Sequence, residues 1–255
     1  MDRIKLCQDT FASLFGGNPN SGEGTDPEFM QILQRYIFGE LSHTGTLNDQ
    51  ERELVTITVL AALSQLPQLQ AHVGACLHVG IKPLAIREAI YQLAPFIGFP
   101  KTLNAISAMN AAFAERGISL PLQDASTVNE EDRLQKGKAI QEPIYGSEIK
   151  DRYGYLPSPF DEAVPRFLSE LCFGDFATRK GLDVKRREML ILVCLAALGG
   201  SDLQVKAHFL GARKSGNSDE ELVCALVHAS AYMGIPRLFN ALNAVSDLLE
   251  ESKEK

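Results

Sequence analysis

Apolar residues in this chain recur at the spacing of α-helices, and few segments show the alternation of a β-strand. The strongest signal is the segment 53–66, which is apolar on nearly every side of a helix. A helix of that kind belongs in a protein core or between subunits. Because Gly and Pro interrupt the apolar groups at intervals of about fifteen residues, the pattern predicts an all-α protein built from short helices.

Residues typical of helix ends place these elements. Asn48 and Glu51 have the spacing of a capping box, so the apolar helix begins there. Three further helices are predicted at 67–80, 83–98 and 100–117, each opened by a proline. The same plan follows later in the chain, with predicted helices at 185–198, 202–216 and 236–251 and a second capping box at Ser218 and Glu221.

The second half of the chain repeats the first, because residues 47–108 correspond to residues 182–244. The matching positions are Arg52-Glu53 with Arg187-Glu188, Ala61-Ala62-Leu63 with Ala196-Ala197-Leu198, Ala71-His72 with Ala207-His208, and Asn104-Ala105 with Asn240-Ala241. Residues that are identical in both copies indicate what the structure or the function of the repeated unit requires. The repeat predicts two tandem helical modules packed as a pseudo-dimer, residues 1–125 and residues 126–255.

Composition narrows the class of protein. The chain has 255 residues, is 45% hydrophobic and 22% charged, and carries a formal net charge of −7. We expect no nucleic-acid partner, because no basic block or basic face is present. No apolar run reaches membrane-spanning length, and the N-terminus lacks the apolar core of a signal peptide, so we expect a cytoplasmic protein without a membrane partner.

Several kinds of site have no signal in the sequence. No HxxxH, HExxH or Cys/His cluster is present, so no metal site is predicted, and no phosphate-binding glycine loop or GxSxG motif occurs. The number of cysteines is odd and none forms a CxxC pair, which favours buried or incidental thiols in a reducing compartment. We expect a small-molecule substrate and no cofactor.

His72 and His208 are the first candidates for chemistry. Each lies in the middle of a predicted helix at the same place in its copy. Glu53 and Glu188 each begin the preceding helix, and antiparallel packing of the two helices would return the carboxylate to the imidazole. Such a contact orients the ring for acid–base catalysis near neutral pH. The alternative is structural: a glutamate complements a helix dipole, and a histidine packs in a core. Periodicity alone favours that alternative.

Four further polar residues are kept in both copies or stand close to the histidines. Arg52 and Arg187 either bind a substrate carboxylate or pair with a neighbouring acid at the surface. Gln68 and Gln204 lie one helical turn before the histidines, where they would line the same pocket. We therefore take these four as candidate substrate-binding residues.

The combination of R-E, L-A-A-L, A-H and G-x-P-x-x-x-N-A resembles the carboxymuconolactone decarboxylase family, also called alkyl hydroperoxidase D-like. Residues 47–112 and 182–245 each look like a full copy of its module. The resemblance implies all-helical modules that assemble into homo-oligomers. For a tandem chain it implies a trimer that imitates a hexamer.

One branch of that family reduces peroxides with a CxxC pair upstream of the histidine. At those two positions this chain has Gln65 and Gln68 in the first copy, and Ser201 and Gln204 in the second. Glutamine and serine form no thiolate, so thiol peroxidase activity is predicted to be absent.

The other branch resembles gamma-carboxymuconolactone decarboxylase, which removes CO2 from a lactone carboxylate without a cofactor. The resemblance implies a histidine as proton donor, a glutamate that orients it and an arginine that anchors the carboxylate. These roles fall on His72, Glu53 and Arg52, and in the second copy on His208, Glu188 and Arg187. The alternative is a non-catalytic module for binding or assembly. The more polar surroundings of His72 favour the first half as the active one.

Overall fold

The structure is a computed structural model that describes residues 2–19, 22, 24–146 and 149–253. Every regular element in those ranges is a helix, which confirms the predicted all-α class. None of the described helices is long and apolar enough to cross a membrane.

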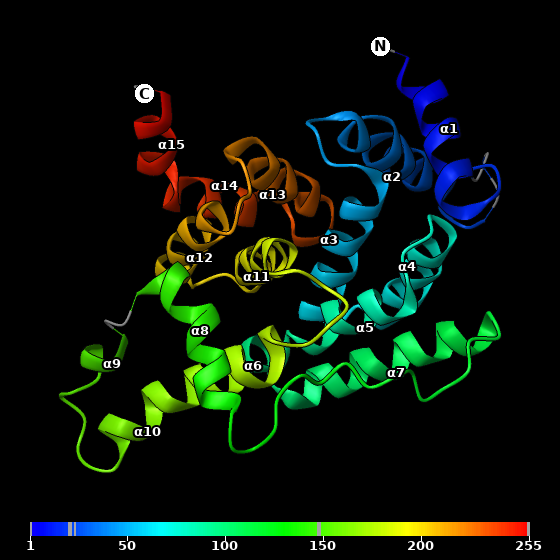
Figure 1. Ribbon diagram of the computed structural model, residues 1–255. Helices are drawn as coiled ribbons and strands as arrows, with labels where there is room; N and C mark the ends of the chain where they lie inside the picture. Colours follow the sequence, from blue (N-terminus) through cyan, green and yellow to red (C-terminus); the bar gives the residue numbers. More distant parts are fainter. Residues whose placement is uncertain (1, 20–21, 23, 147–148, 254–255) are drawn as a thin grey trace.

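The two halves of the chain contain corresponding series of helices (Figure 1). The first half contains α1 (Arg3–Phe15), α2 (Pro27–Gly39), the 3-10 helix η1 (Leu41–His43), α3 (Asp49–Ala62), α4 (Leu66–His78), α5 (Pro83–Tyr91), α6 (Ala94–Ile97) and α7 (Phe99–Glu115). The second half contains α8 (Arg133–Tyr145), α9 (Ile149–Arg152), α10 (Phe160–Phe167), η2 (Leu168–Ala177), α11 (Val184–Leu198), α12 (Asp202–Lys214), α13 (Asp219–Met233), α14 (Ile235–Ala244) and α15 (Ser246–Lys253).

Both predicted capping boxes are present at the starts of α3 and α13. Asn48 accepts the Glu51 backbone N–H at 3.0 Å, and the Glu51 carboxylate accepts the Asn48 N–H at 3.1 Å. Ser218 and Glu221 make the same reciprocal pair. These bonds satisfy backbone donors that no helical carbonyl can reach, so the helices begin where the sequence predicts.

The helix pair that opens each half is held by the same contact. Gly39 of α2 lies directly against α1, since an added Cβ would come within 3.3 Å of the Arg3 Cβ. Gly174 of η2 is equally close to the Arg133 Cβ of α8. Each arginine also forms an ion pair with the acidic residue that follows the glycine, at 2.5 Å and 2.7 Å. The duplication therefore extends to these leading helices.

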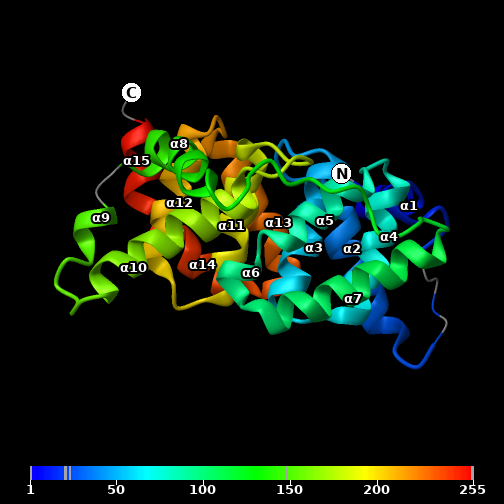
Figure 2. The ribbon, with the colours of Figure 1, turned by 60° about the horizontal axis from the view of Figure 1, so that its bottom comes forward.

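The two halves share one hydrophobic core. α3 packs against α11 and α13 of the other half, and α11 also contacts α6. Figures 1 and 2 show the halves side by side, with α3 and α11 near the middle. Ile57 on α3 and Leu192 on α11 are fully buried, and residues of both halves belong to a single apolar cluster. Burial of each such side chain contributes about 1.5–3 kcal/mol, which favours a rigid pairing of the two halves.

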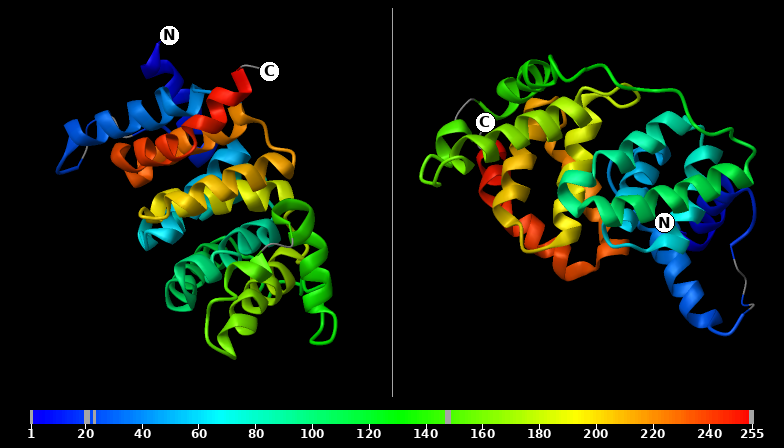
Figure 3. Two further views of the ribbon diagram at one scale, coloured as in Figure 1. Left: turned by 90° about the vertical axis from the view of Figure 1, so that its left-hand side faces the viewer. Right: turned by 90° about the horizontal axis from the view of Figure 1, so that it is seen from below.

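Three elements differ from the sequence-based expectation. The predicted helix 83–98 is divided into α5 (Pro83–Tyr91) and α6 (Ala94–Ile97). The predicted final helix 236–251 is interrupted at Val245, where α14 ends and α15 begins. The bend keeps Val245 and Leu248 buried in the core. Residues 168–177 form a π-helix, η2, which periodicity did not indicate. In Figure 3 (right) the extended segment from α7 to α8 crosses from one half to the other, and α8 and α10 lie on the second half.

Candidate active site

The first glutamate–histidine pair is formed as its spacing suggests. Glu53 lies on α3 and His72 on α4, and the Glu53 Oε2 is 2.8 Å from the His72 Nδ1. The carboxylate is almost completely buried, with its side chain 2% exposed. The short link between two packed helices thus brings two residues nineteen positions apart into one hydrogen bond.

Aromatic rings from both halves enclose the first pair. Phe15 of α1 and Tyr232 of α13 each contact the His72 ring edge to face, with ring centroids 5.6 Å away. Burial and the nearby Glu53 charge raise the pKa of Tyr232 well above its usual value, so its hydroxyl stays protonated. The surroundings of His72 are therefore largely aromatic.

The second pair has the same core geometry with one addition. Glu188 on α11 and His208 on α12 are joined by an Oε2–Nδ1 contact of 3.0 Å. The Tyr145 hydroxyl at the end of α8 donates a short hydrogen bond to the same Glu188 oxygen and lies 2.7 Å from the His208 Nδ1. Phe96 of the first half contacts His208 edge to face at 5.8 Å. Phe15 is the counterpart of Tyr145, so only the second pair has this hydroxyl.

The proton positions in this triad follow from its chemistry. Burial and the Glu188 carboxylate raise the pKa of Tyr145 far above its usual value, so the phenol keeps its proton and donates it to Glu188. A phenol oxygen that donates its own proton can still accept one. The His208 Nδ1 therefore carries a hydrogen shared between the Glu188 and Tyr145 oxygens, and its Nε2 is left for a ligand.

A cavity of about 290 Å³ lies beside the second pair. It is lined by His208, Glu188 and Tyr145 together with residues of both halves. The other lining residues are Gln92, Phe96, Arg152, Tyr153, Leu168, Cys172, Phe173, Phe176, Ala177, Val184, Arg187, Ile191, Gln204 and Ala207. The sequence-based preference was for the first half, whereas this cavity lies beside the pair of the second half.

The π-helix η2 forms one wall of this cavity. Its wider turn is shown by the Thr178 N–H, which donates to the Phe173 carbonyl five residues earlier at 3.1 Å. Leu168, Cys172 and Phe176 of η2 line the cavity. The corresponding segment of the first half is the end of α2 followed by the start of the 3-10 helix η1. Because π-turns are uncommon and occur frequently at functional sites, the change of helix type supports a role for this wall.

Arg52 has no donor left for a substrate in this structure. The side chain is 3% exposed and donates to the backbone carbonyls of Leu47, Leu41 and Thr44 at 2.8–3.0 Å. A fourth contact reaches the Gly45 carbonyl at 3.5 Å. The guanidinium therefore stabilises the backbone of the segment before α3. The sequence had indicated substrate binding or a surface ion pair instead.

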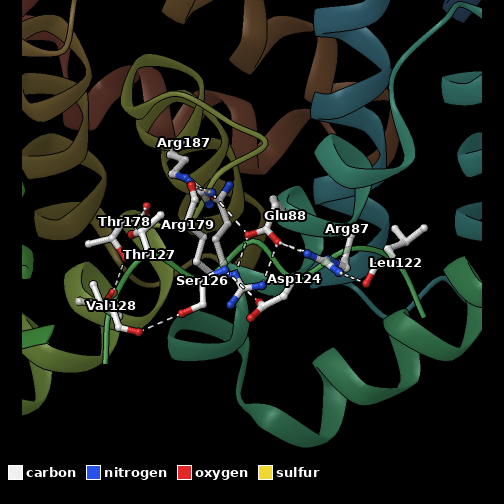
Figure 4. A network of polar contacts seen from close by, with 12 residues as sticks. Arg87, Glu88, Leu122, Asp124, Ser126, Thr127, Val128, Thr178, Arg179 and Arg187 are labelled. Atoms are coloured by element: carbon white, nitrogen blue, oxygen red, sulfur yellow. Dashed lines mark hydrogen bonds and ion pairs between the residues drawn. The ribbon is translucent and has the colours of Figure 1, made fainter. Parts of the chain in front are cut away.

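Arg187 has a different environment at the equivalent position. It donates to the Arg179 carbonyl at 2.9 Å and lies 3.4 Å from the fully buried Glu88 carboxylate. Figure 4 shows Arg87 and Arg179 approaching the same carboxylate. Burial lowers the pKa of Arg187, and the Glu88 charge opposes that shift. Unlike Arg52, Arg187 lines the cavity.

Arg52 and Arg187 each contact a residue of the opposite half, and the two contacted residues occupy equivalent positions. The Arg52 Nη1 is 3.5 Å from the His228 Nδ1 of α13, whereas the Arg187 Nη1 is 3.4 Å from the Gln92 Oε1 after α5. His228 also bonds the Thr56 hydroxyl at 3.0 Å. Burial and the Arg52 charge lower the pKa of His228 to about 3, so it is neutral near pH 7.

The candidate glutamines have unequal positions. Gln204 is exposed and contributes to the cavity wall. Gln68 is exposed on α4, one turn before His72, and is absent from the lining of the cavity beside His208.

The cysteines are free thiols, and the one beside the cavity is a poor nucleophile. Cys172 lies in the cavity wall, and burial raises its pKa to about 11. Burial also raises the pKa of Cys194 to about 12 and that of Cys76 well above its usual value. A thiol with so high a pKa is protonated near neutral pH, so these groups do not supply the thiolate of a peroxidase. Across the described ranges, no group of three or more His, Cys, Asp or Glu is arranged to hold a metal ion.

A family model described as "Carboxymuconolactone decarboxylase family" matches this chain twice, at residues 27–111 and 162–247. Together the two matches cover more than half of the sequence. The chain belongs to this family. The two matched segments confirm the tandem arrangement that the internal repeat predicted.

Two curated relatives each correspond to about half of the chain. A 4-carboxymuconolactone decarboxylase from Acinetobacter baylyi is 27% identical over 124 residues, which are 49% of this chain and 89% of the relative. Nitrosuccinic acid decarboxylase from Metarhizium robertsii is 25% identical over 126 residues, 48% of this chain and 87% of the relative. Each relative thus has the length of one module.

One solved structure matches the whole chain. It is described as a gamma-carboxymuconolactone decarboxylase subunit from Burkholderia xenovorans and has a TM-score of 0.52 at 22% sequence identity. The match covers 100% of this chain and 98% of that chain. At this identity the likeness establishes the fold, and the tandem all-helical family fold is therefore shown.

Sequence reasoning missed two residues of the second site, Tyr145 and Gln92, as candidates for chemistry. Tyr145 was visible only as the counterpart of Phe15, and Gln92 only as the counterpart of His228. The difference between the two copies was a signal in both cases. Tyr145 has a hydroxyl that Phe15 lacks, and Gln92 has an amide where His228 has an imidazole. When two modules keep the same helices, a change of side-chain chemistry at an equivalent position indicates that the two sites have different roles.

Proposed function

We propose that the cavity beside His208 is the active site of a cofactor-independent decarboxylase that acts on a small carboxylated or lactone substrate. The observation that carries this proposal is the Tyr145–Glu188–His208 triad on the wall of a cavity of about 290 Å³. Two relatives named as decarboxylases of small acids support it. In this proposal Glu188 and His208 are catalytic, and Arg187 and Gln204 bind the substrate.

The reaction needs a proton and a leaving molecule of CO2. The bond between the substrate α-carbon and its carboxylate breaks, CO2 departs, and the electron pair stays on the α-carbon as a carbanion delocalised into a neighbouring carbonyl. His208, protonated at both ring nitrogens, transfers the Nε2 proton to that carbon. Glu188 and Tyr145 hold the Nδ1 hydrogen and keep the ring in place. Water then returns a proton to Nε2, so the net change is uptake of one proton per CO2.

The first pair has a structural role in this proposal. Glu53 and His72 are enclosed by Phe15 and Tyr232, and Arg52 is fully engaged with backbone carbonyls. We propose that this half supports the other one and that modules 1–125 and 126–255 act as one unit. The shared core across α3, α11 and α13 supports this view.

We further propose that the protein is a homo-oligomer, with a trimer as the expected state. Equivalent exposed apolar residues at the starts of α7 and α14 support association: Phe99 and Leu103 in one half, Ile235 and Phe239 in the other. Sedimentation velocity gives the mass of the assembly. Cytoplasmic location stays a prediction.

The test is release of CO2 from a panel of small acids that includes 4-carboxymuconolactone and nitrosuccinic acid. We expect turnover of at least one panel member, and a fall in kcat of about 10²–10⁴-fold in His208→Gln, since a positioned proton donor contributes about that much. Equal turnover by wild type and His208→Gln contradicts the proposed role. Binding of panel acids without any CO2 release favours the alternative of a small-molecule-binding module.

A further inference from the structure

Part of the cavity wall in the second half is open at positions that are closed in the first half. The residues that line the cavity there and are partly exposed are Cys172, Phe176 and Ile191. Their counterparts in the repeat are Ile37, Leu41 and Thr56, which are 8%, 6% and 0% exposed. Ile191 stands between two fully buried leucines on α11, so its accessible surface belongs to the cavity that it lines.

This side of the second site also lacks two hydroxyl groups that the first site has. In the first half the Thr56 hydroxyl bonds the His228 ring at 3.0 Å, and a hydrogen bond with Thr56 counters part of the rise in the pKa of Tyr232. The counterparts of Thr56 and Tyr232 are Ile191 and Phe96, which offer only hydrocarbon. Polar groups that bond one another in the first site are therefore replaced by an apolar surface in the second.

The apolar surface is built from both halves and lies next to the triad. Phe96 comes from α6 and contacts the His208 ring, and Ile191 lies three residues after Glu188 on α11. Residues spaced by four along η2 supply the rest of this surface, namely Leu168, Cys172 and Phe176. Because residues three or four apart share one face of a helix, the apolar surface begins about one turn from the Glu188 carboxylate.

The volume of the cavity fits a ring with a short side chain. The space is about 290 Å³. An apolar cavity of about 150 Å³ lined by Leu, Ile and Phe is sufficient to bind benzene. The remaining volume, at about 30 Å³ for each water-sized group, takes about five further heavy atoms. A six-membered ring that carries a short acidic chain therefore occupies the space with little left over.

We propose that the substrate of this cavity is an aromatic acid, whose ring lies against Phe96, Phe176 and Ile191 while its acidic chain reaches His208. This rests on the proposed function of the same cavity, and the ring is the part of the substrate that does not react. Aromatic rings gain stabilisation from edge-to-face or offset contacts with other rings, beyond the area that they bury. The phenylalanines on this surface thus favour a ring over an aliphatic chain.

Calorimetric titration with inert acids tests the proposal without catalysis. The probes are phenylacetate, acetate and hexanoate, a chain acid of similar length to phenylacetate, and none has a carbonyl placed to accept the electron pair of a departing CO2. Acetate is measured by displacement of phenylacetate. For wild type we expect phenylacetate to bind about thirtyfold or more tightly than acetate, through burial of the ring, and more tightly than hexanoate.

Substitutions that place the first-half residue in the second site lower these preferences. In Ile191→Thr the ratio of phenylacetate to acetate affinity should fall by about tenfold, because the ring displaces water from the new hydroxyl. In Phe176→Leu the preference of phenylacetate over hexanoate should be lost. The matched control is Tyr232→Phe, the reverse change at the counterpart of Phe96, which leaves both ratios unchanged. Circular dichroism of each variant establishes that it is folded before titration.

Equal ratios in wild type, Ile191→Thr and Phe176→Leu overturn the proposal, as does hexanoate binding as tightly as phenylacetate in wild type. His208→Gln separates the proposal from the proposed function, because it removes turnover and keeps the ratio of phenylacetate to acetate affinity. Turnover of small acids without a preference for the ring overturns the aromatic substrate and leaves the decarboxylase standing. A preference for the ring without turnover of any acid supports the ring site and contradicts the decarboxylase.

Discussion

The two glutamate–histidine pairs of this molecule share one geometry and differ in their surroundings. The carboxylate–imidazole contacts are 2.8 Å and 3.0 Å. Phe15 covers the first pair, whereas Tyr145 adds a hydroxyl to the second. The second pair borders the cavity of about 290 Å³, one wall of which is the π-helix η2. The pair itself therefore belongs to the architecture of the module, and the groups around it determine whether chemistry is available.

A single small residue accounts for part of this difference. Gly211 on α12 makes room for Tyr145, since an added Cβ would lie 2.6 Å from the Tyr145 Cζ and closer still to its hydroxyl. Its counterpart on α4 is Ala75, which packs in the same apolar cluster as Phe15. Each half therefore matches the size of the helix residue to the ring beside it. Gly211 lies beside Tyr145, and Ala75 packs in the cluster that contains Phe15.

The buried charge at the second site gives the largest expected difference in stability. Glu88→Gln keeps the shape and removes the carboxylate that three arginines share, so we expect a loss of about 3–5 kcal/mol in the free energy of unfolding. Cys224→Ser, at the counterpart position, keeps the donor to the Thr44 carbonyl and is expected to cost less than about 1 kcal/mol. Urea denaturation compares the two, and equal losses would remove the distinction between the sites.

His228 gives the first site its own dependence on pH. Its pKa is lowered to about 3 in the folded protein, whereas an unfolded histidine titrates near 6.5. Between these values the unfolded chain binds the extra proton, so stability falls as the pH falls through this window. The expected slope is about 1.4 kcal/mol per pH unit.

His228→Gln places the second-site residue in the first site and removes this contribution. Urea denaturation from pH 7 to pH 4 is the measurement. The variant should show a slope smaller by about one proton than the wild type. An unchanged slope would mean that His228 is not the group that carries the effect.

Gly211→Ala sharpens the comparison at the triad. The added methyl group displaces the Tyr145 ring from Glu188 and His208, and we expect kcat/KM to fall by about tenfold to a hundredfold. Tyr145→Phe should cause a similar loss. The double variant should be no worse than either single variant, because both changes remove the same interaction. Ala75→Gly in the first half is the matched control, and losses that add in the double variant would contradict the coupling.

Much of the fold followed from the sequence. The capping boxes at Asn48 and Ser218 set helix starts through local hydrogen bonds, which adjacent residues determine. The Glu53–His72 contact also followed, because a short link between antiparallel helices leaves few arrangements. The all-helical class and the tandem plan rest on such local signals and on the repeat.

The parts that the sequence did not reveal depend on how the chain folds back on itself, over short and long separations. Arg52 was expected to bind substrate or a surface acid, yet the fold buries it against carbonyls of the segment before α3. Tyr145 reaches Glu188 from a helix 43 residues away in the chain. The π-helix has no periodic signal of its own. Side-chain identity at one position does not reveal which groups the tertiary fold places beside it.

The most direct test of the account is the kcat/KM of His72→Gln in the CO2-release assay that identifies the substrate. The glutamine introduced by this substitution retains an N–H that can bind Glu53, so the core stays satisfied, and unfolding by urea checks that stability is kept. We predict a value within about threefold of wild type, against the loss of about 10²–10⁴-fold expected for His208→Gln. A loss in His72→Gln as large as that in His208→Gln, in a protein of unchanged stability, would contradict the assignment of chemistry to the second site alone.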